Sequence, residues 1–285
     1  MNNLEYLSKY LSTLELEGYS SKTIKIYKII IQNFLSSFSK PISEITTSDI
    51  RSYLSNYKTI HNISNVTLSN YQHYISSFFN WVTKEGYLSQ NPCLNLRPIK
   101  TPKVIKDGFT EQEMAIIRKN CCNIRQKALV ETLYSSGLRV SELVSLNKED
   151  INWDRGITKV VGKGNKERDV YFSDDAIKLL KEYLQTREDN NEALFVTLIK
   201  PIKRMTIDAV ENSLRALGGR CGIHVHPHRF RHTCATVLLE RGMPIQDVSE
   251  ILGHSKLETT MIYCTLNKKK IMDKYNECMN GARAK

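Results

Sequence analysis

Apolar residues recur at helical spacing along most of the chain and alternate with polar residues in only a few short runs. In the first ninety residues, four segments place an apolar side chain at every third or fourth position, as on one face of an amphipathic helix. They are residues 4–14, residues 22–38, a short segment from the capping residues Thr46–Asp49 to Leu54, and a longer one from Leu68 to Val82. The pattern predicts a four-helix domain over residues 1–90.

Residues 91–108 interrupt this pattern. Prolines keep a segment extended, so these residues are predicted to form a linker. Its basic side chains could contact the phosphates of a polyanionic partner, because each phosphate neutralised releases counterions; a plain hydrophilic tether is the alternative. The prolines are Pro92, Pro98 and Pro102, and the lysines are Lys100, Lys103 and Lys106.

Residues 109–264 mix both periods and predict a second domain. Thr110 caps a helix whose first turn is acidic, and a further helix runs to about Gly137. Three β-rich runs separated by turn residues predict a small antiparallel sheet. Helices then return near 174–186, 205–220, 228–241 and 245–252. The predicted fold is therefore mainly α, with a mixed α+β second domain.

The C-terminal segment 265–285 carries another apolar stripe at helical spacing, formed by Ile271, Tyr275, Cys278 and Met279. An amphipathic helix needs a surface on which to bury its stripe. That surface belongs either to the same domain or to a neighbouring protomer.

Composition adds a location and a class of partner. Seven cysteines without repeated spacing favour reduced thiols and a cytoplasmic location. The sequence contains no run of 18 apolar residues, so no membrane span is predicted. The N-terminus lacks a signal-peptide core. The net charge is +11, of which segments 91–108 and 265–285 together hold +7. This uneven excess suggests a polyanionic partner, although a basic surface can also serve solubility alone.

Candidate chemistry is concentrated between His228 and Tyr263. His228 and Arg231 lie three residues apart and share one helix face. Gly253 stops a later helix, and His254 and Tyr263 follow that stop. An arginine and two histidines directed at one place describe a pocket for an oxyanion such as a phosphate. A tyrosine delivered to that pocket could be its nucleophile.

The sequences HRFRHTCAT, LGHS and IY, preceded by SSGLRVSELVSL and VVGKGNKER, resemble the tyrosine recombinase (phage integrase) family. The chain is similar to compact two-domain, Xer-like members of that family. It implies a SAM-like core-binding domain over 1–90 and a catalytic domain over 109–264. It also implies cleavage and rejoining of DNA through a 3′-phosphotyrosyl intermediate and a Holliday junction, serving integration, excision or dimer resolution.

The resemblance further implies partners. These are double-stranded DNA with an inverted-repeat core site and other copies of the chain, forming a tetramer on two sites. A paralogous recombinase or an accessory DNA-bending protein could also take part, whereas no membrane is expected. Segment 265–285 would then dock on a neighbouring protomer.

The family's roles can be carried over to matching positions. Tyr263 is the expected nucleophile, and Arg139 and Arg231 fit a paired phosphate clamp. His228 is expected to act as base or hydrogen-bond partner and His254 as a donor to a non-bridging oxygen. Lys163, at the tip of a predicted turn, is the expected general acid. Supporting roles fall to Glu142, which would orient Arg139, and to Lys166 and Arg168 as DNA-backbone contacts. With a DNA substrate implied, the linker residues Lys100, Lys103 and Lys106 are also expected to bind DNA.

Other functions remain open. His224, His226, His228 and His232 have metal-ligand-like spacing, as in a metal-dependent nuclease, but no carboxylate lies in segment 220–236 and no cysteine pair suits zinc. The GKGNK sequence lacks the spacing and hydroxyl of a P-loop. No metal or cofactor is therefore expected. A type IB topoisomerase-like relaxing enzyme, or a DNA-binding protein with a vestigial site, remains as an alternative.

Overall fold

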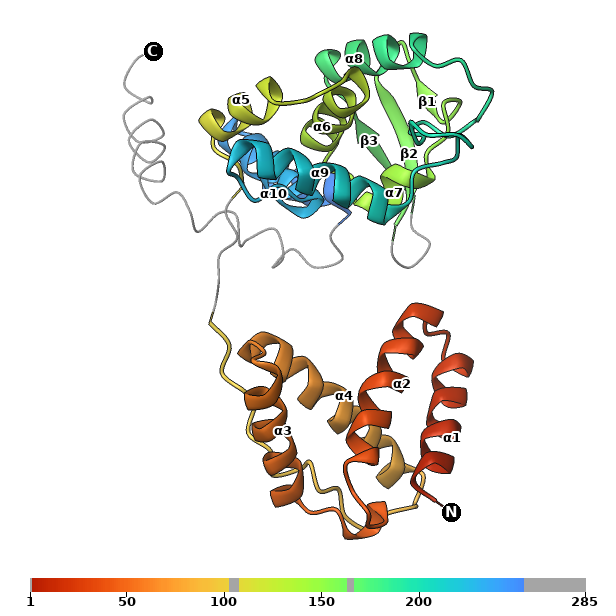
Figure 1. Ribbon diagram of the computed structural model, residues 1–285, viewed down its shortest axis with the longest axis vertical. Helices are drawn as coiled ribbons and strands as arrows, with labels where there is room; N and C mark the ends of the chain where they lie inside the picture. Colours follow the sequence, from red (N-terminus) through yellow and green to blue (C-terminus); the bar gives the residue numbers. More distant parts are fainter. Residues whose placement is uncertain (1, 103–107, 163–166, 254–285) are drawn as a thin grey trace, which may run out of the picture. The chain divides into compact units, whose positions relative to one another are not determined.

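A computed structural model of the protein describes residues 2–102, 108–162 and 167–253 (Figure 1). The chain divides into two compact units, Met1–Val104 and Ile105–Lys285. Each unit has its own hydrophobic core. Within the described residues, no helix is both long enough and apolar enough to cross a membrane.

The first unit is the predicted bundle of four helices. They are α1 (Asn3–Leu16), α2 (Ser21–Ser36), α3 (Thr47–His61) and α4 (Asn65–Lys84), with a short 3-10 turn η1 (Ile42–Glu44) before α3. The bundle closes on side chains that are fully buried, among them Phe34, Ile75, Phe78 and Phe79. The apolar spacing along the helices thus identifies the face that each one buries.

Helix α3 is longer than predicted. The Thr46–Asp49 capping box starts it as expected, but it continues past Leu54 to His61. The added residues are mostly polar, so no apolar stripe marks them in the sequence. Tyr57 nevertheless packs on α4, where its hydroxyl lies 2.8 Å from that of Tyr71. This tertiary contact supports the helix where its own periodicity does not.

The first part of the predicted linker packs against the helical unit instead of running free. Cys93 is buried in the core of that unit. Three backbone carbonyls accept hydrogen bonds from α3 and α4: Pro92 from Thr47 (2.7 Å), Arg97 from Gln72 (3.0 Å) and Lys100 from Asn65 (3.1 Å). An extended segment leaves its carbonyls available for such bonds. The Lys100 side chain is exposed, while Lys103 and Lys106 lie outside the described residues.

The second unit is mainly helical with one small sheet, as predicted. The strands β1 (Ile151–Asn152), β2 (Ile157–Val161) and β3 (Glu167–Tyr171) pair antiparallel in the order β1-β2-β3, with Ile151 opposite Thr158 and Thr158 opposite Val170. The helices are α5 (Glu111–Lys119), α6 (Ile124–Ser136), α7 (Val140–Ser145), α8 (Asp174–Gln185), α9 (Ile207–Cys221), α10 (Pro227–Glu240) and α11 (Ile245–Leu252).

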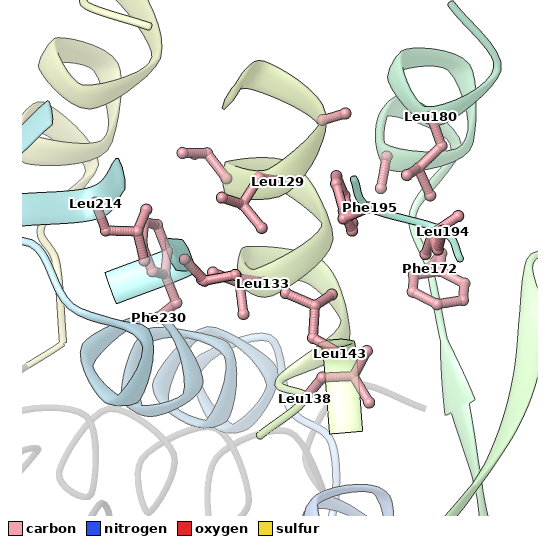
Figure 2. Packing of buried hydrophobic residues seen from close by; sticks show 14 of the residues in the cluster. Leu129, Leu133, Leu138, Leu143, Phe172, Leu180, Leu194, Phe195, Leu214 and Phe230 are labelled. Atoms are coloured by element: carbon pink, nitrogen blue, oxygen red, sulfur yellow. The ribbon is translucent and has the colours of Figure 1, made fainter. Parts of the chain in front are cut away.

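Helix α6 is the centre of this unit. Figure 2 shows its residues Leu129 and Leu133 with Phe230 of α10 on one side and Phe195 on the other. All four of these side chains are at most 1% exposed. A helix buried on nearly every side is a rigid support. The residues that follow it, including Arg139, are therefore presented from a fixed end.

Candidate active site

Arg139 lies at the junction between α6 and α7. Gly137 ends α6 with a φ of +59°, and Arg139 is the N-cap residue of α7. Its backbone N–H donates to Oε2 of Glu142, and its Nη1 donates to Oε1. Each of these two hydrogen bonds is 2.8 Å long. The predicted contact between the two residues is therefore present, although Arg139 precedes the helix and does not lie within it.

Glu142 is buried, with 7% of its side chain exposed. Burial alone raises the pKa of a carboxyl group, but here hydrogen bonds from Arg168, from the Arg139 backbone and from the Arg139 side chain outweigh it. Together they lower the pKa of Glu142 to about 2. Glu142 is therefore an anion at any working pH, which suits a residue that holds arginines and not one that exchanges protons.

Helix α10 positions His228 and Arg231. Pro227 occupies its first turn, where a missing N–H costs nothing. His228 is exposed, and its ring lies edge-on to that of His232 at 5.4 Å between centroids. Arg231, one turn further along, is only 4% exposed. It donates to the carbonyl oxygens of Gly137 (2.7 Å) and Leu252.

Arg139 and His228 line the same groove, whose volume is about 840 Å³. Its walls come from the start of α7, from α9 and from the segment leading into α10. Two charged residues of α9, Glu211 and Arg215, also line it and were not selected from the sequence. Their spacing of four residues places them on one helix face, but only the fold shows that this face borders the groove.

Arg168 was predicted to contact the DNA backbone, but in the structure its side chain is buried within the protein. Its side chain is 7% exposed. Its Nη1 and Nη2 donate to the two carboxylate oxygens of Glu142 at distances of 2.9 and 2.7 Å. Its Nε donates to the carbonyl oxygen of Ile251 at 2.8 Å. A guanidinium enclosed in this way by protein acceptors does not face an external phosphate, so the prediction for Arg168 is corrected.

The remaining predicted site residues lie outside the described residues. They are Lys163, Lys166, His254 and Tyr263. Of the residues predicted to carry the chemistry, the structure describes Arg139, Glu142, His228 and Arg231, and it joins Arg168 to them through Glu142.

The histidines suspected of binding metal form two pairs. His224 and His226 have ring centroids 5.0 Å apart, like the pair of His228 and His232 described above. Over residues 2–102, 108–162 and 167–253, no three potential ligands from histidine, cysteine or carboxylate side chains gather closely enough to hold a metal ion. The groove itself is lined by two arginines, three histidines and one glutamate, namely Arg139, Arg215, His224, His226, His228 and Glu211.

Two comparisons by sequence decide the family. The model of the phage integrase family matches residues 107–270, and that of the phage integrase N-terminal SAM-like domain matches residues 6–87. The chain belongs to the phage integrase family. It is 34% identical to the tyrosine recombinase XerC of Leptospira interrogans, over 98% of this chain and 94% of that protein. It is 32% identical to XerA of Pyrococcus horikoshii, over 95% and 92% respectively.

Solved structures agree with this assignment. A crystal structure of XerA recombinase is 31% identical and covers 97% of this chain and 98% of its own, with a TM-score of 0.55. A lambda integrase dimer bound to a core site has the same fold at 18% identity, with a TM-score of 0.77 over 92% of this chain and 77% of that one. The protein is a site-specific tyrosine recombinase. The predicted family, fold class and enzyme class are confirmed.

Proposed function

We propose that this recombinase cleaves and rejoins double-stranded DNA through a covalent 3′-phosphotyrosyl link to Tyr263. The observation that carries the proposal is the convergence of Arg139 and His228, from two separate elements, on one groove, with Arg231 one turn further along α10. Guanidinium groups match phosphate oxygens and remain charged at any working pH. In phosphoryl transfer, such an arginine contributes roughly 10³–10⁵ in rate.

The reaction divides into two transesterifications. In the first, the Tyr263 oxygen bonds to the scissile phosphorus while the bond to the 5′-oxygen breaks. His228 takes the phenolic proton, Lys163 gives one to the departing oxygen, and His254 donates to a non-bridging oxygen. In the second, a 5′-hydroxyl attacks the phosphotyrosine and the tyrosine leaves. Phenol has a pKa of about 10, so the phosphotyrosine stays reactive and rejoining needs no ATP.

The recombinase is proposed to act as a tetramer on two inverted-repeat sites, exchanging strands through a Holliday junction. Two DNA-bound proteins of the same fold support the coarser part of this proposal, oligomer formation on DNA: the lambda integrase structure contains a dimer on a core site, and a XerH recombinase is bound to a palindromic substrate after cleavage. Segment 265–285, with its net charge of +4, would link neighbouring protomers. Residues 1–90 and the basic segment 91–108 would bind the DNA beside the cleavage site.

Replacing Tyr263 with phenylalanine tests the central claim, because it removes only the attacking oxygen. Tyr263→Phe should bind DNA nearly as well as the wild type and form no SDS-resistant protein–DNA adduct. Tyr171→Phe is the matched control, since Tyr171 is exposed on β3 and outside the proposed chemistry. An adduct that persists in Tyr263→Phe would place the nucleophile elsewhere.

A second assay separates recombination from simple relaxation. The substrate is a supercoiled plasmid with two target sites. A recombinase should produce circles in which the two sites have been exchanged, and their amount should rise with the amount of relaxed plasmid. A type IB topoisomerase-like enzyme would relax the plasmid without exchanging the sites, because it shares the chemistry but does not bring two sites together.

A further inference from the structure

The C-terminal end of α11 is held by three arginines, one from β3, one from α10 and one from the position just before α7. Nε of Arg168 donates to the carbonyl of Ile251, and Arg231 donates to the carbonyl of Leu252. Nη2 of Arg139 donates to the carbonyl of Gly253 at a distance of 3.0 Å. Carbonyls at a helix C-terminus lack intrahelical partners and carry partial negative charge. These cations therefore satisfy the end of the helix that directly precedes His254.

Arg168 differs from the other two because it also contacts Glu142 through both terminal nitrogens. Glu142 in turn holds the Arg139 guanidinium at 2.8 Å. A two-pronged contact fixes the carboxylate plane as well as its position. The orientation of Arg139 in the groove is therefore set by a carboxylate that Arg168 anchors from β3.

Gly253 shows how closely α11 passes Arg168. Its φ is +62°, and a Cβ added there would lie 2.8 Å from Cδ of Arg168. The aliphatic part of Arg168 thus lies directly under the last residue of the described chain, and its guanidinium bonds the carbonyl two residues earlier. One side chain contacts both Glu142 and the end of α11.

We infer that Arg168 is a positioning residue, which orients Arg139 through Glu142 and places the end of α11 from which the chain continues to His254 and Tyr263. This inference rests on the proposed phosphotyrosyl reaction. Arg168 touches neither phosphate nor nucleophile in this role. It couples two parts of the site that are far apart in sequence.

Arg187 offers a matched control, because it is also a buried arginine in a two-pronged ion pair. Its side chain is 6% exposed, it binds both carboxylate oxygens of Asp189, and it donates to the carbonyls of Asn191 and Ala193. None of these groups belongs to the groove. Arg187→Gln thus removes the same kind of interaction without touching Glu142 or α11.

The test measures adduct formation in a single turnover at saturating protein, together with DNA affinity over a range of salt. Arg168→Gln should slow the rate constant about 100-fold, the size of effect that a misplacement of 1 Å can produce. Its DNA affinity and salt slope should not change. Arg187→Gln should retain the wild-type rate constant. The double variant Glu142→Gln/Arg168→Gln should be about as slow as the slower single variant, because residues acting as one unit are not additive.

Three results would overturn the inference. A salt slope reduced by about 0.9 with an unchanged rate constant would make Arg168 a phosphate contact. If Arg168→Gln and Arg187→Gln slow adduct formation equally, the role of Arg168 is limited to stability. The same follows if the losses in rate constant of Glu142→Gln and Arg168→Gln multiply in the double variant. If Arg168→Gln does not fold, Arg168→Lys makes the same comparison, since it keeps the charge but not the two-pronged geometry. Failure of the proposed reaction is recognised separately, because the wild type would then form no adduct.

Discussion

At the scale of single residues, the arginines of the site are already engaged with protein oxygens. Arg139 donates from its side chain to Glu142 and to the Gly253 carbonyl, and Arg231 donates to the carbonyls of Gly137 and Leu252. A guanidinium has five N–H donors in a rigid fork, so Arg139, whose side chain is 31% exposed, can be held by the protein and still bind a phosphate. Holding the side chain before DNA arrives lowers the entropic cost of ordering it during the reaction.

Lys163 can be separated from its neighbours by changing the leaving atom. An alkoxide leaving group has a conjugate acid about as weak as water, with a pKa near 15.7, so it needs a proton in the transition state. A thiol has a pKa of about 8.5, and a thiolate can leave unaided. Lys163→Ala should therefore be badly impaired on normal DNA and recover most cleavage on DNA with a 5′-bridging phosphorothiolate, as measured by adduct formation.

The same substrate discriminates the other residues. Arg139→Ala and Arg231→Ala should not recover, because their charge is needed on the non-bridging oxygens whichever atom leaves. Lys166→Ala, a change in a proposed backbone contact, should show neither the large defect nor the recovery. Equal slowness of Lys163→Ala on both substrates would identify Lys163 as a binding residue and leave the general acid to be found.

At the scale of elements, the site depends on how closely α11 packs on the end of α6. Gly137 ends α6 in the left-handed region, and a Cβ added there would lie 2.6 Å from Cδ2 of Leu252. The Gly137 carbonyl also accepts from Arg231. One glycine therefore allows both the helix stop and the approach of the helix that leads to His254.

Gly137→Ala should destabilise the second unit and displace α11. The left-handed backbone alone costs about 1–2 kcal/mol for a residue with a Cβ, and the contact with Leu252 adds to this. Gly222→Ala is the stability control, because Gly222 has a φ of +67° but nothing within 4 Å of an added Cβ. Urea unfolding should show a larger loss for Gly137→Ala than for Gly222→Ala. Equal losses would show that α11 does not press on α6.

At the scale of the whole molecule, the basic segment 91–108 joins the two units, and its first part is docked on the helical unit by its carbonyls. Docking through backbone oxygens leaves the side chains available, and that of Lys100 is exposed. This arrangement suits a segment that would contact DNA phosphates while remaining attached to the helical unit.

Neutralising Lys100, Lys103 and Lys106 together should weaken binding to all DNA sequences alike. Each lost phosphate contact should lower the slope of log affinity against log salt by about 0.9, while the cleavage rate at saturating protein stays unchanged. Neutralising Lys119, Lys178 and Lys181, which are exposed on α5 and α8, provides a control of equal charge. If both triple variants give the same slope, the segment is a tether and not a DNA contact.

Much of this protein follows from its sequence alone, because the relevant signals are local. Apolar spacing, capping residues and the glycine stops at Gly137 and Gly253 act within a few residues, and they predicted most helices of both units, the small sheet and the helix carrying His228 and Arg231. The pairing of Arg139 with Glu142 was also predictable, since the two residues are three positions apart. The family could be recognised for the same reason, as its sequence blocks are short and ordered.

Only the tertiary structure decided which arginine faces solvent and which is enclosed. Arg168 resembles any basic strand residue in the sequence, yet its partners Glu142 and Ile251 lie 26 and 83 positions away. The docking of residues 91–100 and the extra turns of α3 likewise depend on side chains from other helices. Burial, and with it the pKa of Glu142 and the role of Arg168, is a property of what packs on a residue, which no local pattern contains.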